Sequence, residues 1–211
     1  GQAGDARGIT CFLTPCDTPG VKIEEYLWTF NMPTDHPRVS FTNVWVPADA
    51  MFGEEGRGLP LAQSFVHENR IRQAASSLGA AAFCVNESVK YARERVVFDR
   101  PIGQNQSIQH PLAQSWMELE AAEMMAMRAA WKYDNSLPCG ADANAAKYMA
   151  AEAGFNACQR AMATLGGYGY AKEYHVERYL REMMIPRIAP ISPQLILCFI
   201  AEKVLGLPKS Y

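Results

Sequence analysis

Three long stretches of helical periodicity make up most of the sequence. Apolar residues, many of them alanine, recur at three- and four-residue steps over residues 59–95, 108–133 and 142–165. Pro101 interrupts the pattern after the first stretch, and a loop at residues 135–140 follows the second. Long helices joined by short connections pack antiparallel against one another, so the sequence predicts a helical bundle.

Two shorter helices are predicted at residues 176–184 and 194–205. The segment Gly-Gly-Tyr-Gly-Tyr at residues 166–170 lies between the third long stretch and these shorter ones. Glycine commonly ends a helix, and it also allows a ligand to approach the backbone closely.

The amino-terminal quarter of the chain has a different pattern. A short β-favouring run at residues 9–13, a turn at 17–20 and an imperfectly alternating run at 21–27 precede a full strand at 39–46, which Pro47 closes. Two or three short strands cannot bury a core by themselves. We therefore expect this segment to belong to a sheet whose other strands lie elsewhere.

The composition is typical of a globular protein in water, with 49% apolar and 20% charged residues. The formal net charge of -2, without a basic block, argues against a nucleic-acid partner. No apolar run approaches the roughly 20 residues that span a bilayer. These features predict a cytoplasmic protein without a membrane span, or one of the mitochondrial or peroxisomal matrix in a eukaryote.

Six cysteines and four histidines are scattered along the sequence, without a Cys-x-x-Cys pair. A metal site needs ligands at converging positions, so no metal site is predicted. We expect reduced, mostly buried cysteines, as in a cytosolic compartment. The first five residues contain no signal-peptide core and are typical of a chain that starts in the middle of a protein.

Four segments occur in a characteristic order. They are residues 44–47 with 56–58, residues 95–102 with Gln106, residues 165–170 with 173–174, 176–178 and 181–182, and residues 191–206. In this order and spacing, the sequence resembles the acyl-CoA dehydrogenase superfamily over essentially its whole length.

The resemblance implies a mainly α fold. Residues 53–211 would form the C-terminal domain of the four-helix-bundle type, and residues 1–52 the tail of the middle β-domain. It also implies FAD as cofactor, α,β-dehydrogenation of an acyl-CoA thioester, and a homodimer or homotetramer that passes electrons to an electron-transfer flavoprotein. Because the amino-terminal half of such a protein builds much of the site, we expect the isolated chain to bind FAD poorly.

Arg95 and Phe98 stand at a predicted helix end before a proline. A guanidinium there could bind a phosphate, and the ring could contact a flat cofactor. The resemblance implies that Arg95, Phe98 and Gln106 contact the FAD of a neighbouring subunit. The alternative is a surface arginine and a core phenylalanine.

The resemblance implies further cofactor contacts at Gly167, Ser192 and Gln194. For Gly167 the alternative is a simple helix stop. The sequence departs from the family at Ala163, where a glutamine usually contacts the cofactor diphosphate. One polar contact to the cofactor is therefore expected to be missing.

Substrate contacts are implied at Asn69 and Arg70, in the first long helix. The matching family arginine is buried near the thioester end of the substrate, and a buried arginine needs a carboxylate or carbonyl partner. The alternative for Arg70 is an exposed helix position.

The family removes the α-proton of the substrate with a carboxylate whose pKa is raised by partial burial. The usual glutamate position falls on Pro190, which has no acid function. A minority of members carry the base at the position of Asn69, and an amide cannot replace it. Glu68 lies one residue earlier, about 100° around the helix, and is the candidate for a displaced base, or else a solvated carboxylate.

Three hypotheses follow. The chain could belong to a working dehydrogenase with Glu68 as base. It could belong to an acyl-CoA flavoenzyme of the elimination or desulfination type, which does not need that base. It could also be a non-catalytic subunit that completes a partner's flavin site.

Overall fold

The computed structural model describes residues 7–30 and 32–210, and of residues 32–35 the backbone alone. The chain forms two compact units, Gly1–Phe65 and Val66–Tyr211, which are described separately. Helix α1 (Gly58–Glu94) begins in the first unit and continues in the second.

The first unit contains a long β-hairpin. Strands β2 (Val21–Thr29) and β3 (Met32–Phe41) pair antiparallel, with Val21 opposite Phe41. Two shorter strands, β1 (Cys11–Phe12) and β4 (Met51–Phe52), form a second antiparallel pair. A short 3-10 helix, Ala48–Ala50, precedes β4.

The prediction of a strand over residues 39–46 is wrong beyond Phe41. The register starts β2 at Val21, so residues after Phe41 have no strand partner in the described part of the chain. The chain turns there: Asn43 has a φ of 50°, and the amide of Thr42 donates to the carbonyl of Gly20 at 2.9 Å. Gly20 is itself required, because a Cβ there would lie 2.3 Å from the carbonyl oxygen of Thr42.

Large apolar side chains of this unit are exposed, among them Trp28 (84%), Phe41 and Trp45. A two-stranded hairpin is marginally stable in water at best. These side chains therefore need further strands or another surface to cover them, as the sequence led us to expect.

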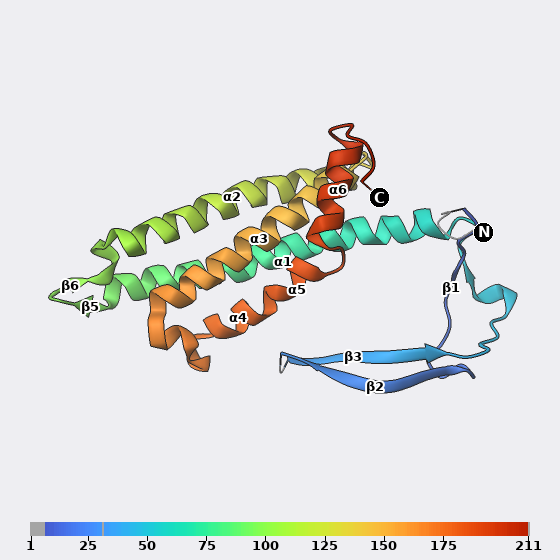
Figure 1. Ribbon diagram of the computed structural model, residues 1–211, viewed down its shortest axis with the longest axis horizontal. Coiled ribbons are helices and arrows are strands. Elements are labelled where there is room, and N and C mark those ends of the chain that lie inside the picture. Colours follow the sequence, from blue (N-terminus) through green and yellow to red (C-terminus); the bar gives the residue numbers. More distant parts are fainter. Residues whose placement is uncertain (1–6, 31, 211) are drawn as a thin grey trace. The chain divides into compact units, whose positions relative to one another are not determined.

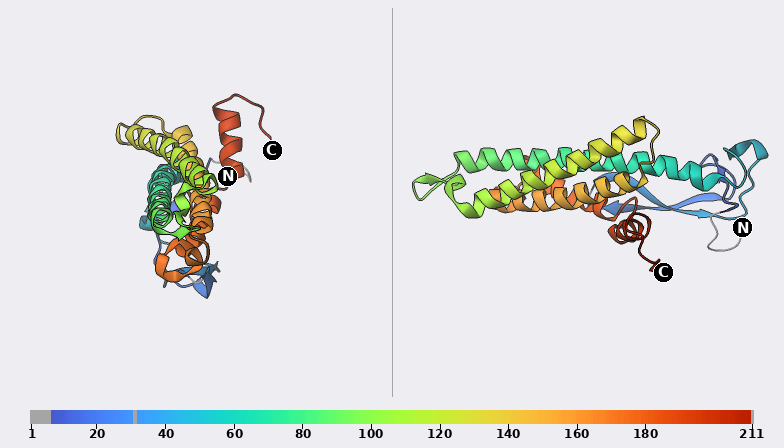
Figure 2. Two further views of the ribbon diagram at one scale, coloured as in Figure 1. Left: turned by 90° about the vertical axis from the view of Figure 1, so that its left-hand side faces the viewer. Right: turned by 90° about the horizontal axis from the view of Figure 1, so that it is seen from above.

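The second unit is the predicted helical bundle. The part of α1 from Val66 onwards packs with α2 (Gln106–Asp134) and α3 (Gly140–Leu165), and the three helices lie side by side (Figures 1 and 2). The shorter helices α4 (Val176–Glu182), α5 (Met184–Ile188) and α6 (Pro193–Lys203) follow α3. The helix predicted at 176–184 is thus two helices, α4 and α5.

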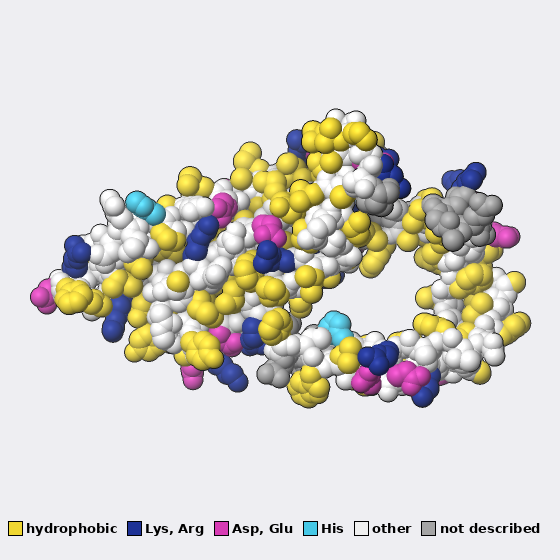
Figure 3. Space-filling view, in the orientation of Figure 1, with side chains coloured by type: hydrophobic (Ala, Val, Ile, Leu, Met, Phe, Trp, Pro, Cys, Tyr) yellow, Lys and Arg dark blue, Asp and Glu magenta, His cyan; other side chains and the backbone are white. Residues whose placement is uncertain are grey.

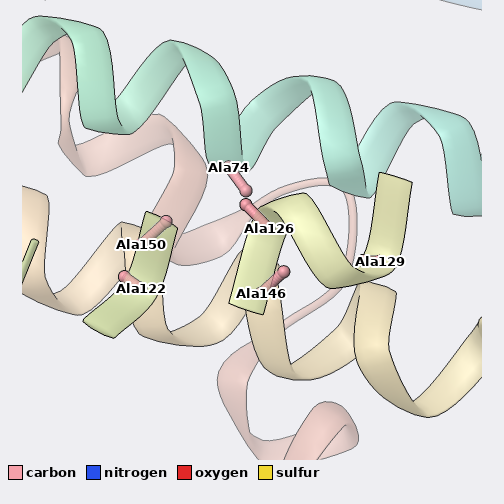
Figure 4. Packing of buried hydrophobic residues seen from close by; sticks show 6 residues of the cluster. All are labelled: Ala74, Ala122, Ala126, Ala129, Ala146 and Ala150. Carbon is pink, nitrogen blue, oxygen red and sulfur yellow. The ribbon is translucent and has the colours of Figure 1, made fainter. Parts of the chain in front are cut away.

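Alanine makes the centre of the bundle. Six alanines from α1, α2 and α3 form one buried cluster (Figure 4): Ala74, Ala122, Ala126, Ala129, Ala146 and Ala150. Small side chains let helix backbones approach closely while losing no side-chain entropy on burial. Gly154 continues this close packing, since a Cβ there would lie 2.5 Å from the terminal methyl of Met183.

Several large apolar side chains remain on the bundle surface. Figure 3 shows apolar side chains over α6, where Leu195, Leu197, Val204 and Leu205 lie in or just after the helix and are about half exposed or more. On α2 the exposed apolar residues are Trp116, Met117, Met124, Met127 and Trp131. Within residues 7–30 and 32–210, no single helix has the length and apolarity to cross a membrane, although the bent pair Val176–Ile188 and Pro193–Lys203 meets the test jointly.

The cysteines fit the sequence prediction in part. All six are free thiols; Cys84, Cys139 and Cys158 are buried, whereas Cys16 is exposed.

Candidate functional site

A short hairpin joins α1 to α2 at one end of the bundle (Figure 1). Its strands, β5 (Val96–Val97) and β6 (Arg100–Pro101), are connected by Phe98 and Asp99, with φ values of 52° and 60°. Positive φ at both central residues is the geometry of a tight type I′ turn, in which phenylalanine is unusual.

Phe98 lies at the tip of this hairpin and is 93% exposed. The alternative of a core phenylalanine is therefore wrong. Arg95, directly after α1, and Gln106, the first residue of α2, are also exposed. The connection from α1 to α2 thus exposes an aromatic ring, a guanidinium and an amide. Their roles in cofactor binding stay predictions.

A groove of about 590 Å³ lies between the hairpin and the carboxyl end of α3. Arg95, Val97 and Ile102 line it from one side, and Leu165 and Gly167 line it from the other. The structure therefore brings together two predicted cofactor contacts, Arg95 and Gly167, that are far apart in the sequence.

The glycines in this groove differ in what they require. Gly166 caps α3 with a φ of 59°, which favours glycine by conformation alone. Gly167 shows no such positive φ, and a Cβ there would have no atom within 4 Å. Nothing in the described chain demands a glycine at position 167.

A second group of predicted residues surrounds the turn between α5 and α6. Ser192 caps α6, and its hydroxyl oxygen accepts a hydrogen bond from the amide of Leu195 at 3.3 Å. Pro190 and Gln194 are exposed. This group lies on a different part of the bundle from the β5–β6 hairpin (Figure 1).

The three predicted residues on α1 have different surroundings. Glu68 is exposed, and no hydrogen bond or ion pair to another described residue holds it. Asn69 is half-buried, and its side-chain oxygen accepts a hydrogen bond from Arg72. Arg70 is 6% exposed, so the alternative of an exposed helix arginine is wrong.

Among the residues that the structure describes, Arg70 has no carboxylate or carbonyl partner of the kind that was expected. One of its terminal nitrogens lies 3.0 Å from Nδ1 of His67, and its buried Nε has no hydrogen-bond partner within residues 7–30 and 32–210. Burial lowers the pKa of Arg70, and burial together with the charge of Arg70 lowers the pKa of His67. A neutral imidazole, accepting at Nδ1, is therefore the form that suits this contact.

Lys147 is a residue of this region that the sequence analysis missed. It lies on α3, is 1% exposed, and its ammonium donates to the carbonyl oxygen of Ile191 at 2.7 Å. Burial, and secondarily the charge of Arg70, lower the pKa of Lys147 to about 8, while Glu152 opposes this shift. A lone lysine within the alanine stripe of α3 was the sequence signal that could have identified it.

The chain is similar to known proteins over nearly its whole length. The family described as "Acyl-CoA dehydrogenase, C-terminal domain" matches residues 56–195. The acyl-CoA dehydrogenase FadE12 of Mycobacterium tuberculosis is 38% identical over 202 residues, covering 95% of this chain and 52% of its own length.

The chain is also similar in fold to solved structures. Butyryl-CoA dehydrogenase from Megasphaera elsdenii superposes with a TM-score of 0.89 at 31% identity, over 97% of this chain and 54% of its own. A structure described as "PigA with FAD and proline" superposes with a TM-score of 0.90 at 26% identity, over 96% of this chain and 53% of its own. The chain therefore spans about half the length of the relatives it matches.

Proposed function

Because the chain belongs to the acyl-CoA dehydrogenase family, as its carboxyl-terminal half, we propose that it serves an FAD-dependent oxidoreductase acting on an acyl-CoA thioester. Within it, residues 1–52 would be the tail of the middle β-domain and residues 53–211 the helical domain. The single observation that carries this proposal is that Arg95 and the bare backbone of Gly167 line one groove, at the base of the hairpin whose tip exposes Phe98.

The residues present fit an extended anionic cofactor with flat rings. Arg95 can bind a phosphate oxygen, and Phe98 offers a ring that touches little of its own chain. No described neighbour of Gly167 requires a glycine at this position, yet the glycine leaves the backbone uncovered. Close approach of a ligand to this backbone would explain the glycine. When bound, FAD would accept the hydride that leaves the β-carbon of the acyl group.

The predicted cofactor contacts form two groups on different parts of the bundle. We infer that Arg95, Phe98, Gln106 and Gly167 contact the FAD of a neighbouring copy, whereas Ser192 and Gln194 contact the cofactor held beside the α5–α6 turn. Two copies would then complete one another's sites. The absence of glutamine at Ala163 removes one polar contact from the first group.

The exposed apolar side chains of α2 and α6 support this assembly. Monomeric proteins rarely expose large contiguous apolar patches. We propose that these helices are covered in a homodimer or homotetramer, and that an electron-transfer flavoprotein reoxidises the cofactor. The cytoplasmic or organellar-matrix location stays a prediction.

The proton-abstracting group is the open part of the mechanism. Pro190 has no acid function, so the loop before α6 supplies no carboxylate at the usual position. We propose Glu68 as the displaced base, with Asn69 and Arg70 beside the thioester. Glu68 is exposed in this half of the protein. The amino-terminal half would therefore have to cover the Glu68 carboxylate in order to raise its pKa.

The Glu68→Gln variant tests this assignment in the assembled flavoprotein, meaning this segment together with the amino-terminal half that its relatives possess. We expect the rate of flavin bleaching by acyl-CoA to fall at least about a hundredfold, as for the loss of a general base. Glu55→Gln, at an exposed position before α1, is the matched control and should bleach at the wild-type rate. Full-rate bleaching by Glu68→Gln would exclude Glu68 as the base.

Pro190 also favours the two alternatives. A flavoenzyme of the elimination or desulfination type, or a subunit that only completes a partner's flavin site, would have no need of a carboxylate there. The non-catalytic role predicts one flavin per two chains, with none reduced at this chain's own acyl site. The elimination role predicts a chemical product other than the α,β-unsaturated thioester.

A further inference from the structure

Lys147 is a buried cation that the proposed function does not yet explain. It lies on α3 between Ala143, Ala146 and Ala150, each of which is fully buried. Lysine is almost never fully buried unless it is paired, because an ammonium loses its hydration in the interior. Its retention in an alanine core therefore needs a reason other than packing.

The ammonium of Lys147 has no carboxylate bonded to it among the described residues. Its hydrogen-bond partner is the neutral carbonyl of Ile191, at 2.7 Å. Glu152 acts on it only through its field, because its carboxylate pairs with Arg187 at 2.9 Å, and Arg70 repels it. A buried charge in this situation costs stability, so ion pairing does not account for the lysine.

The carbonyl that Lys147 binds belongs to a particular peptide unit. Ile191 lies between Pro190 and Ser192, and the peptide plane that carries its carbonyl also carries the amide of Ser192. Ser192 in turn caps α6, through its hydroxyl to Leu195 and its carbonyl to the amide of Ile196 at 3.2 Å. Holding the carbonyl of Ile191 therefore sets the position of Ser192 and the start of α6 relative to α3.

We propose that Lys147 is a positioning residue for the turn of residues 189–194. Acting through the carbonyl of Ile191, it holds Ser192 and Gln194 against the long helices at the geometry that the flavin and the acyl group require. The inference rests on the proposed function, which assigns those two residues to the cofactor. A charged donor binds a carbonyl more strongly than a neutral one, which explains why a lysine is used despite its cost.

A purely structural lysine predicts a different behaviour. Apolar residues of similar volume often replace buried charges without loss of stability, so a methionine would serve packing equally well. Lys132 provides the contrast within the same bundle. Its ammonium lies 2.6 Å from the carboxylate of Asp142, which is 4% exposed, and this pair lies at the α2–α3 contact.

The test compares Lys147→Met with Lys132→Met in the assembled flavoprotein. In Lys147→Met we expect the backbone amides of residues 191–196 to exchange with deuterium about tenfold faster, and flavin bleaching by acyl-CoA to slow about tenfold, without loss of thermal stability. In Lys132→Met we expect lower thermal stability, with amide exchange at the turn and the bleaching rate per folded molecule unchanged. Lys147→Gln, which keeps a neutral N–H donor, should fall between Lys147→Met and wild type.

Wild-type exchange at residues 191–196 in Lys147→Met would overturn the proposal, as would failure of both Lys147 variants to fold, since the lysine would then be structural. Faster exchange at the turn with an unchanged bleaching rate would also overturn it. The exchange measurement does not depend on the reaction. If the wild-type protein failed to bind FAD or to be reduced by any thioester, the proposed function would fail instead.

Discussion

The ammonium of Lys147 lies 2.7 Å from the carbonyl oxygen of Ile191 and so joins α3 to a turn 44 residues further along the chain. This bond connects the alanine core of the bundle with the loop that contains Pro190, the residue that the sequence resemblance aligns with the family's usual catalytic glutamate. It also gives the core an ionisable group, because burial lowers the pKa of Lys147 to about 8.

The pKa of Lys147 makes stability depend on pH. The folded chain lowers this pKa from its ordinary value of 10.5 to about 8, so between these values the unfolded chain binds more protons. The penalty for the buried ammonium is therefore complete below about pH 8 and disappears above the unfolded pKa. Its size is on the order of 3 kcal/mol, from about 1.4 kcal/mol per pKa unit.

We predict that the difference in free energy of unfolding, wild type minus Lys147→Met, increases as the pH rises from 7 to 10. Urea titrations of both proteins at several pH values measure this difference and cancel the contribution of other groups. A difference that is constant with pH, or that shrinks as the pH rises, would contradict the lowered pKa.

Phe98→Ala should weaken FAD binding by about tenfold, since an aromatic contact is worth about 0.5–1.5 kcal/mol beyond its buried area. Because Phe98 is 93% exposed, its removal should leave thermal stability unchanged. FAD affinity is measured by fluorescence titration of the assembled apoprotein. Phe98→Tyr keeps the ring and should bind normally, and equal affinity of the alanine and tyrosine variants would remove Phe98 from the site.

The two adjacent glycines should respond in opposite ways. Gly166→Ala places a Cβ at a φ of 59° and should lower stability by about 1 kcal/mol, with the FAD site otherwise intact. Gly167→Ala meets no strain in the described chain, so stability should hold while FAD affinity falls. Thermal unfolding and FAD titration of both variants check this contrast, and normal FAD affinity in Gly167→Ala would make position 167 a simple helix stop.

Asp142 anchors the contact between α2 and α3. It is 4% exposed and pairs with Arg128 at 2.7 Å and with Lys132 at 2.6 Å. Asp142→Asn should lower the free energy of unfolding by about 2–3 kcal/mol, somewhat less than for a fully buried pair because both cations are partly exposed. Urea unfolding measures the loss, and an effect below about 0.5 kcal/mol would show that the pairs contribute little.

The sequence predicted the bundle well because its signals are local. Helical periodicity with breaks at Pro101 and residues 135–140 located α1, α2 and α3 to within a few residues. The strand over residues 39–46 was predicted too long, because local alternation continues past Phe41 whereas strand length depends on where β2 begins. Pairing register is a non-local property that a single segment does not encode.

The sequence analysis proposed individual residues for the candidate site, but not which of them lie together in the fold. The ordered motifs predicted cofactor contacts at Arg95, Phe98 and Gly167, and these roles stay predictions. The structure places Arg95 and Gly167 in one groove. The burial of Arg70 and the bond from Lys147 to Ile191 depend on packing between α1, α3 and the α5–α6 turn. A lysine in an alanine stripe indicates an unusual position, but only the fold shows what its ammonium binds.

The most direct test of the proposed function is the visible absorption spectrum of the assembled flavoprotein, titrated with a panel of acyl-CoA thioesters that differ in chain length and branching. We predict that the protein binds FAD and that at least one thioester bleaches the oxidised flavin band while an α,β-unsaturated thioester forms. A protein that binds FAD but keeps an unchanged spectrum with every thioester would contradict the proposed function.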